Sequence, residues 1–482
     1  MDAFPINRDL RFEASEVRAR ASSPTAAAFD GKGAMEGLKM AAKPTSDEEG
    51  GRFPGLVAFG LDACRSAWRI AARPGQARRV LAGMFAANVA IQILNLGTGV
   101  LTARALGPDG RGELAAILLW PQFLVYCLAL GLPASLVYHL KKRPWDASQL
   151  VGASLASSLA LGAVASLVGV FALPVWLANY PHRVVLVAQL AMAVAPLTSL
   201  SLTLLTILQG FESFAAFNWL RLAQPALTLA GLSAIAALHA LTALSGAAIY
   251  LLAPLPVTAW NARYVLRQAP PSFERLLTHL RALYSYGLRY SVADFAGTLA
   301  GQADRVVIAG FLRPAELGLY VVAQSLAQLL GMISATATTV LFPKAAGLER
   351  ASALRLSMRS AAQSGLAALV AAAPLIVLGP WLLGVVYGPE FANVGGFLAT
   401  LVAASAVAVV CLVLQQGLLA IGRPGVASLT QTFGVAASVA LLWLLTPRYG
   451  LEGAALAMLA AALVRFAFLA IAVIGFARRV PD

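Results

Sequence analysis

Charged side chains are scarce in this chain. Only 12% of its 482 residues are Asp, Glu, Lys or Arg, whereas a soluble domain is typically about 25% charged. The three cysteines and four histidines lie far apart, which excludes a disulfide framework and a clustered metal site. Asp-x-Asp motifs and His–carboxylate clusters are also absent. We therefore expect no catalytic residues and no bound metal, and the chain does not have the composition of a soluble protein.

Apolar sequence is abundant instead, because 59% of the residues are hydrophobic. A helix needs roughly 20 apolar residues to cross a bilayer. We therefore predict an all-α polytopic membrane protein with about twelve transmembrane helices. The predicted spans are residues 80–105, 113–139, 148–172, 184–208, 215–238, 245–266, 287–311, 318–341, 361–386, 396–420, 426–446 and 454–477.

Lys and Arg are distributed unequally between the two sets of loops. Seventeen of them lie in the loops of one side and only four in the loops of the other, which the positive-inside rule assigns to the cytoplasm and the outside, respectively. Both termini are therefore predicted to be cytoplasmic. The net charge of +14 is an orientation signal, so a nucleic-acid partner is not expected.

Two segments lie outside these spans. Residues 1–72 are polar and of mixed charge, which is typical of a largely disordered cytoplasmic tail. Residues 267–286 contain a leucine stripe flanked by basic residues, and we expect an interfacial linker on the cytoplasmic membrane surface. The remaining chain divides into an N-terminal six-helix lobe, 80–266, and a C-terminal six-helix lobe, 287–477.

The span at 287–311 carries charge inside an apolar helix. At about 100° per residue, five polar residues share one arc of about 80°. A charge near the bilayer centre costs on the order of 2.5–3.5 kcal/mol, so it faces a water-filled cavity or a buried partner. This helix alone leaves both a substrate pathway and a structural ion pair open. The residues of this stripe are Ser291, Asp294, Thr298, Gln302 and Arg305.

The second half of the chain repeats the first. Six helices are an even number, so both copies enter the membrane in the same direction. Parallel repeats of this kind are related by an axis along the membrane normal, and their interface forms the substrate site. The anchors are Leu106-Gly-Pro108-x-x-x-Gly112 with Leu312-Arg-Pro314-x-x-x-Gly318 and Gln122 with Gln328 at a shift of 206, and Tyr180 with Tyr387 at a shift of 207.

The repeat places a second polar stripe on the first span. Asn88 is the counterpart of Asp294, and Gln92 and Asn95 lie within about 40° of it around the helix. A structural ion pair does not require a second, neutral stripe, so the repeat favours a central cavity walled by both halves. Further amides on the second and eighth spans are predicted to line it: Gln122, Gln324 and Gln328.

Three more ionisable residues lie within the predicted spans. Asp304 is next to Arg305 but off the stripe, and adjacent residues on a helix do not face each other, so each needs a partner elsewhere. Arg221 and Arg465 could pair with Asp304 or Asp294, or could face the cavity. The sequence leaves these alternatives open.

Two of these segments resemble a known family. They are Leu101-Thr-Ala-Arg-Ala-Leu-Gly-Pro-Asp-Gly-Arg-Gly-Glu and Asp304-Arg-Val-Val-Ile-Ala-Gly-Phe-Leu-Arg-Pro-Ala-Glu-Leu-Gly-Leu-Tyr. They are similar to the polysaccharide biosynthesis and export proteins, the Wzx-type oligosaccharide flippases of the multidrug/oligosaccharidyl-lipid/polysaccharide (MOP) exporter superfamily. The resemblance covers about residues 80–477 and implies two lobes around a cavity lined by the first, second, seventh and eighth spans.

The resemblance also implies a function. It is the movement of a polyprenyl-pyrophosphate-linked oligosaccharide across the bacterial inner membrane by alternating access, for O-antigen, capsule or exopolysaccharide assembly. The polar stripes would bind the glycan, and Arg305 would hold the pyrophosphate in a bidentate fork. Asp294 could carry a coupling proton or sodium ion, or be a structural counter-ion. The expected partners are the lipid-linked oligosaccharide, membrane lipids and a polysaccharide polymerase or export machinery.

Three alternatives compete with this interpretation. A multidrug or small-cation exporter of the same superfamily would favour an acidic cavity, which Arg305 does not. A membrane enzyme would need catalytic groups on a sizeable surface loop, and the predicted outer loops are short. A non-transporting scaffold of a polysaccharide synthesis complex would not need the polar stripes.

Overall fold

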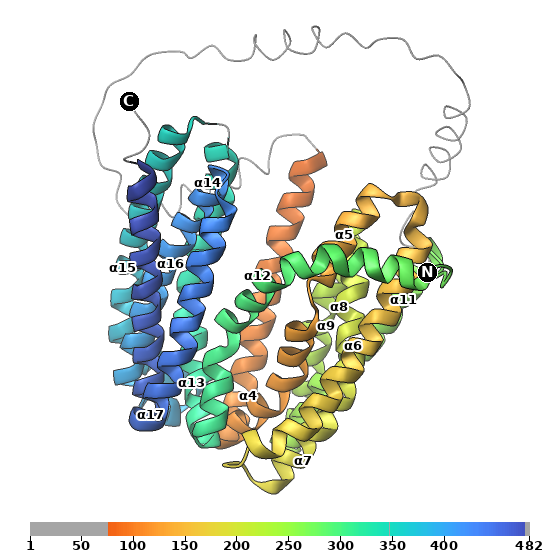
Figure 1. Ribbon diagram of the computed structural model, residues 1–482. Helices are drawn as coiled ribbons and strands as arrows, with labels where there is room; N and C mark the ends of the chain where they lie inside the picture. The colour runs from red at the N-terminus through yellow and green to blue at the C-terminus, as the bar shows by residue number, and fades with distance from the viewer. Residues whose placement is uncertain (1–75, 347, 478–482) are drawn as a thin grey trace, which may run out of the picture. The chain divides into compact units, whose positions relative to one another are not determined.

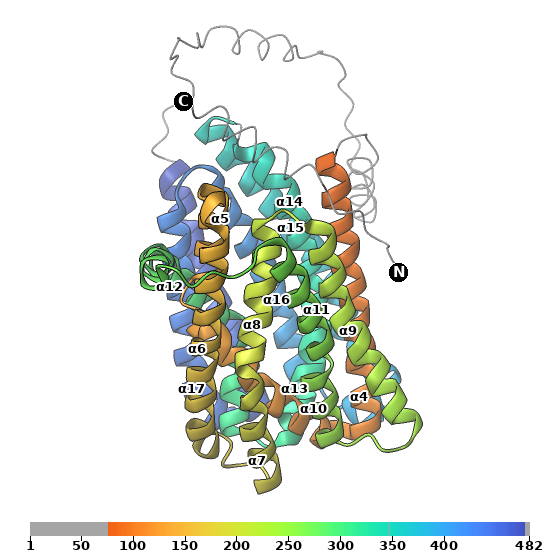
Figure 2. The same cartoon turned by 90° about the vertical axis from the view of Figure 1, so that its right-hand side faces the viewer.

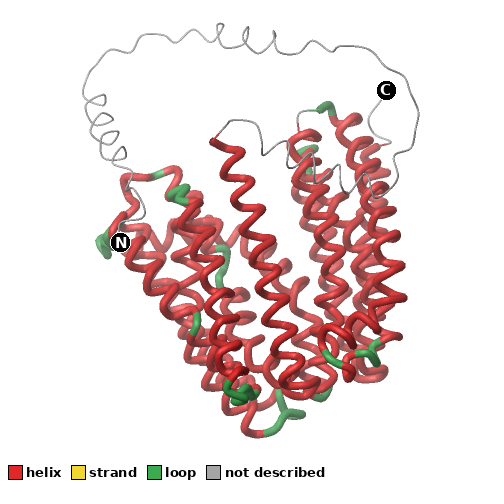
Figure 3. The backbone as a smooth tube through the Cα atoms, turned by 180° about the vertical axis from the view of Figure 1, so that it is seen from behind, coloured by secondary structure: helices red, strands yellow, loops and turns green. Residues whose placement is uncertain are grey.

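The structure is a computed structural model that describes residues 76–346 and 348–477 of the chain. Within these residues every regular element is a helix, and short loops join the helices (Figures 1 and 3). This confirms the all-α fold. The predicted tail at 1–72 lies outside the described residues.

Residues 76–268 form eight α-helices. Several of them have a proline in the first two positions, where its missing N–H costs no helical hydrogen bond. Figure 2 shows α6, α8 and α11 along one another, and they are in contact through α8. The helices are α4 (Gln76–Leu128), α5 (Leu132–Lys142), α6 (Ala147–Trp176), α7 (His182–Ala191), α8 (Ala195–Gly210), α9 (Phe214–Ala237), α10 (Ala243–Leu252) and α11 (Pro254–Gln268), with 3-10 turns η1 (Pro144–Asp146) and η2 (Met192–Val194).

The second half begins with α12, which contacts α17 as well as α4, α5 and α6 of the first half. Helices α14, α15, α16 and α17 lie side by side (Figure 1). The helices are α12 (Leu276–Phe311), α13 (Pro314–Ala327), α14 (Gly331–Ala346), α15 (Arg350–Tyr387), α16 (Gly395–Ala420) and α17 (Pro424–Ala477), with 3-10 turns η3 (Gln328–Leu330) and η4 (Pro389–Phe391).

The two longest helices each contain a glycine at which the chain turns. Gly107 in α4 has φ of 66°, and Gly450 in α17 has φ of 59°, a region that glycine enters without a Cβ penalty. Helix α17 therefore holds two predicted spans. Helix α4 holds the first predicted span and most of the second, which continues into α5 after a turn. Among the described residues, nine helices are long and apolar enough to cross a membrane, and α12 is not one of them. The protein is a multi-pass membrane protein, and the count of twelve spans stays a prediction.

Helix α12 starts earlier than the sequence predicts. It begins at Leu276, so part of the predicted linker at 267–286 is continuous with the span that follows. The first turns of α12 are held against α5, where Ser135 Oγ donates to the Leu283 carbonyl at 2.6 Å. The Tyr138 and Tyr286 rings stack there, with 4.2 Å between centroids. The boundary between two lobes stays a prediction.

Three clusters of buried hydrophobic residues form the core. The largest contains residues of both halves, such as Leu114 on α4, Leu317 on α13 and Phe391 in η4. The second contains only residues up to Leu283, and the third only residues from Leu341 onward. The two halves of the chain therefore share a core near the turns at 106–112 and 312–318. Elsewhere one cluster joins the first half to the start of α12, and the other lies within the second half.

Candidate functional site

The two repeated turns meet face to face, and we call them the paired turns: residues 106–112 and 312–318. A Cβ on Gly112 would lie 1.7 Å from the Pro314 carbonyl oxygen, and one on Gly318 would lie 2.0 Å from the Pro108 carbonyl oxygen. Only glycine permits this backbone contact. Because 108 and 112 correspond to 314 and 318 in the repeat, the contact is the same from both sides, as in an isologous interface.

A second pair of contacts follows the same symmetry. On one side, Arg104 Nε donates to the Val386 carbonyl at 2.7 Å, and its Nη2 donates to the Val385 carbonyl. On the other, Asn179 Nδ2 donates to the carbonyls of Gly310 and Phe311 at 3.3 and 3.2 Å. A shift of 206 takes 104 to 310, and a shift of 207 takes 179 to 386. These polar contacts therefore connect the two halves in equivalent places.

The tyrosines that the repeat aligns are both buried near the paired turns, but their hydroxyl groups differ. The Tyr387 hydroxyl lies 3.1 Å from Ser325 Oγ. The Tyr180 hydroxyl has no hydrogen-bond partner among the described residues, because Leu119 stands where the repeat has Ser325. Burial raises the pKa of Tyr180, and the charges of Glu316 and Glu113 raise it further. Tyr180 therefore stays neutral at physiological pH.

A pocket of about 600 Å³ lies between α12 and the helices of the first half. It brings together four of the residues predicted to line a cavity: Gln122 from α4, and Thr298, Gln302 and Arg305 from α12. Gly297 and Gly301 lie on the same face of α12 and keep that wall low, since no atom lies within 4 Å of a Cβ added at either. The remaining lining residues are Tyr126, Ala129, Pro133 and Leu202.

Arg305 is held by an amide on the next helix. Its Nε donates to Gln324 Oε1 at 2.7 Å, and Gln324 Nε2 donates to Asp304 Oδ2. A carboxylate only accepts and a guanidinium only donates, so one amide orientation satisfies both groups. The terminal amino groups of Arg305 donate to no described residue, which leaves them available to an anion in the pocket.

Asp304 is 2% exposed and is satisfied without a cationic side chain. Its Oδ2 accepts from the Tyr320 hydroxyl at 2.8 Å as well as from Gln324, and its Oδ1 accepts from the Arg305 backbone N–H at 2.8 Å. A buried carboxylate requires such donors. The network is therefore a support behind Arg305: Tyr320 and Asp304 fix Gln324, and Gln324 fixes the guanidinium.

The alternative in which Asp304 pairs with Arg221 or Arg465 is wrong. Arg221 stacks on the ring of Phe217 at 5.1 Å from its centroid. Arg465 Nη2 donates to Gln415 Oε1 at 2.5 Å. Each arginine has another partner among the described residues, and helical periodicity within one span could not reveal this.

The other predicted site residues lie outside the described pockets. Gln324 is buried between α12 and α13, so it supports Arg305 rather than facing the cavity. Gln328 is exposed in η3. Asn88, Gln92 and Asn95 are exposed on α4, and their role in a cavity stays a prediction. The side chain of Asp294 lies outside the described residues.

Several residues that build the site were not found from the sequence. Tyr320 and Tyr126 carry no charge and lie in apolar runs. The partner of Tyr320 becomes visible only when α13 folds back along α12, and the place of Tyr126 in the pocket only when α4 packs near α12. Arg104 caps the end of α15, a contact between distant segments that the sequence does not indicate. Among the described residues no group of three His, Cys, Asp or Glu side chains could hold a metal ion.

Comparison with solved structures defines the class of fold. The chain is similar to the lipid II flippase MurJ in an inward closed conformation, with a TM-score of 0.68, 14% identity, and coverage of 81% of this chain and 87% of that chain. It is also similar to an inward-facing multidrug resistance MATE family transporter of the MOP superfamily, with a TM-score of 0.64, 17% identity, and coverage of 81% and 96%. The fold is that of MOP superfamily transporters.

The family follows from the sequence. The profile of the polysaccharide biosynthesis protein family matches residues 81–348, which is more than half of the chain. The chain belongs to this family, as the resemblance of its motifs predicts. No protein of curated function is significantly similar to it in sequence.

The core bears on the conformation. One buried cluster is continuous at the paired turns, and two further clusters lie apart from it elsewhere. The protein is therefore closed at the paired turns.

Proposed function

We propose that this protein is a flippase that moves a polyprenyl-pyrophosphate-linked oligosaccharide across the bacterial inner membrane by alternating access, for assembly of a surface polysaccharide. It performs no chemistry on its cargo. In this proposal both termini are cytoplasmic, the paired turns close the outer side, and the pocket beside Arg305 receives the headgroup from the cytoplasmic side. A polymerase or export machinery would take up the product.

The observation that carries the proposal is the environment of Arg305. A guanidinium in a membrane helix is energetically costly unless it is paired or hydrated. This one is held by Gln324 at 2.7 Å, faces a polar pocket, and keeps its terminal donors unpaired among the described residues. Two adjacent donors on a planar group match a pyrophosphate in a bidentate manner. The amides of Gln122 and Gln302 suit the hydroxyl groups of a glycan.

The transport cycle follows from the symmetric contacts. Opening at the paired turns breaks two equivalent sets of interactions, at Gly112 and Gly318 and at Arg104 and Asn179. Release of the headgroup outward requires this opening, together with closure at the opposite end, so each half moves as a unit. We include in the proposal that a proton or sodium ion bound at Asp294 couples this movement to an ion gradient.

The test is transfer between leaflets in proteoliposomes. The probe is a polyprenyl-pyrophosphate oligosaccharide labelled on its glycan, and its leaflet is read by a glycan-cleaving enzyme that does not cross the membrane. We expect Arg305→Ala to slow transfer about thirtyfold or more, since truncating one partner of a buried charge pair costs about 2 kcal/mol or more. Arg305→Lys keeps the positive charge but loses the two adjacent donors of the guanidinium, so its transfer rate falls between those of wild type and Arg305→Ala.

Further variants in the same assay test the parts of the proposal one by one. Arg263→Ala removes an exposed arginine of α11 outside the pocket and leaves the rate unchanged. Asp294→Asn abolishes dependence on a proton or sodium gradient if Asp294 is the coupling site, and retained dependence contradicts that role. Wild-type protein that transfers no labelled lipid but extrudes cationic dyes would replace the flippase proposal with the exporter.

A further inference from the structure

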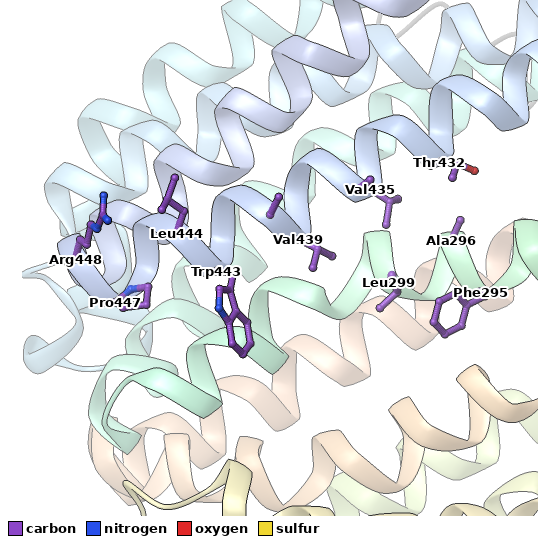
Figure 4. A pocket seen from close by; sticks show the side chains of 12 residues that line it. Phe295, Ala296, Leu299, Thr432, Val435, Val439, Trp443, Leu444, Pro447 and Arg448 are labelled. Atoms are coloured by element: carbon purple, nitrogen blue, oxygen red, sulfur yellow. The ribbon is translucent and has the colours of Figure 1, made fainter.

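A larger and more apolar groove lies on another face of α12. It runs between α12 and α17 and has a volume of about 870 Å³ (Figure 4). Phe295 and Leu299 of α12 lie across from Val435, Val439 and Trp443 of α17. Thr432 stands at one end and Arg448 at the other, and the rest of the lining is apolar.

The groove is long in the direction of the helices. Its residues on α17 recur every three or four positions from Thr432 to Arg448, which places them on one face. The sixteen steps from Thr432 to Arg448 span about 24 Å at 1.5 Å per residue. The hydrocarbon core of a bilayer is about 30 Å thick, so the α17 wall of the groove extends through most of it. An extended chain fits this space, whereas a compact sugar headgroup does not.

Helix α12 forms a wall of both the groove and the Arg305 pocket. At about 100° per residue, with Thr298 as zero, Arg305 lies near −20° and Gln302 near 40°. On the groove side, Phe295 lies near 60° and Leu299 near 100°. The polar and apolar arcs therefore meet between Gln302 and Phe295, without an intervening helix face. A molecule with a charged head and an apolar tail can occupy both sides of α12 at once.

We propose that the groove between α12 and α17 holds the isoprenoid chain of the lipid-linked substrate while its pyrophosphate is at Arg305. This inference rests on the proposed function. The charge of Arg305 holds the pyrophosphate in the pocket. The attached isoprenoid chain leaves the pocket past Phe295 and enters the apolar groove, which shields it from water. An ordinary phospholipid keeps its headgroup at the membrane surface and gains nothing from the polar arc, which is why the substrate's own chain is the better occupant.

The groove can be filled without disturbing the core. Ala436 and Ala440 are exposed positions of its wall on α17, so Ala436→Trp and Ala440→Trp place a ring in the groove. Ala373 is an exposed alanine of α15 away from the groove, and Ala373→Trp is the matched control. The carriers are a full-length polyprenyl and a short prenyl pyrophosphate, each bearing the same labelled oligosaccharide.

We expect the groove variants to slow transfer of the full-length carrier about tenfold, since the added ring displaces apolar chain from the groove. Transfer of the short carrier stays at the wild-type rate, and Ala373→Trp transfers both normally. Equal rates for wild type and groove variants with the full-length carrier would overturn the inference while leaving the flippase intact. Wild type that transfers neither carrier would instead refute the proposed function.

A binding experiment on the unmodified protein tests the inference without any substitution, so it decides the question even if the groove variants do not fold. A polyprenyl pyrophosphate with a photoreactive group on its chain should cross-link within residues 432–448 of α17 or 295–299 of α12, and unlabelled polyprenyl pyrophosphate should compete. Cross-links confined to other helices would contradict the inference. Equal cross-linking by a photoreactive phospholipid would assign the groove to bulk lipid.

Discussion

Gln324 decides what Arg305 can do. The amide stands between a buried carboxylate and a guanidinium, and its two ends match the needs of each. A longer or more flexible side chain in place of Gln324 would let Arg305 turn away from the pocket, or would let Asp304 pair with Arg305 directly and neutralise its charge. The interposed amide keeps the positive charge available while fixing its position, which is the arrangement that anion binding requires.

The first prediction concerns this amide. Gln324→Leu removes two hydrogen bonds to charged groups and leaves Asp304 with fewer donors, so we expect it to lower the free energy of unfolding by about 3 kcal/mol. Chemical unfolding in mixed micelles measures this value. Gln328→Leu, at an exposed position one turn later, is the matched control and should change it by less than about 0.5 kcal/mol. Equal effects of the two substitutions would show that Gln324 does not hold the network.

At the scale of elements, the paired turns are the closest contact between the two halves. The Pro108 and Pro314 carbonyls occupy the space that a Cβ on Gly318 or Gly112 would need. At each of the paired turns, the backbone of one half of the chain therefore contacts the backbone of the other half directly. Such a contact is sensitive to small changes in size, because a single methyl group on either glycine would overlap the facing carbonyl oxygen.

The second prediction follows from this close approach. Gly112→Ala and Gly318→Ala force the turns apart, and overpacking of this kind typically costs about 1–3 kcal/mol, a shift of about tenfold or more in the population closed at the turns. The measurement is labelling of Gln302→Cys, in a background without the native cysteines, by a membrane-impermeant maleimide outside the cell. We expect faster labelling in both variants.

Gly331→Ala provides the control for this experiment. No atom lies within 4 Å of a Cβ added at Gly331, so the substitution should leave the labelling rate unchanged. Slower labelling in Gly112→Ala than in the parent would contradict closure at the paired turns, or place that end in the cytoplasm.

At the scale of the whole molecule, the two halves contact each other through equivalent positions. Arg104 reaches the last carbonyls of α15, and Asn179 reaches those of α12. Helix C-termini present unsatisfied carbonyls, so both contacts satisfy the same chemical need. The two contacts lie at positions that the repeat aligns, but the donor comes from opposite members of the aligned pairs, Arg104 in one contact and Asn179 in the other.

The third prediction uses this difference between the donors. Arg104→Ala removes two charge-assisted hydrogen bonds, whereas Asn179→Ala removes neutral ones that are worth about 1 kcal/mol. We therefore expect both variants to raise outside labelling of Gln302→Cys, and Arg104→Ala to raise it several-fold more. Arg263→Ala should have no effect. If only one of the two variants opened the protein, the contacts would not act as an equivalent pair.

Much of this architecture could be predicted from the sequence because it rests on local chemistry. Span length, loop charge and the helical periodicity around Thr298, Gln302 and Arg305 depend on residues near each other in the chain. The internal repeat predicted which segments correspond, and the matching turns at 106–112 and 312–318 are where the structure brings the halves together.

The sequence by itself determined that the chain is a helical membrane protein and that one face of 287–311 is polar. Only the tertiary structure decided that Asp304 is satisfied by Tyr320 and Gln324 instead of an arginine, and that α12 separates a polar pocket from an apolar groove. The physical reason is that periodicity fixes the direction of a side chain around its own helix. The group that it meets depends on which helix packs there.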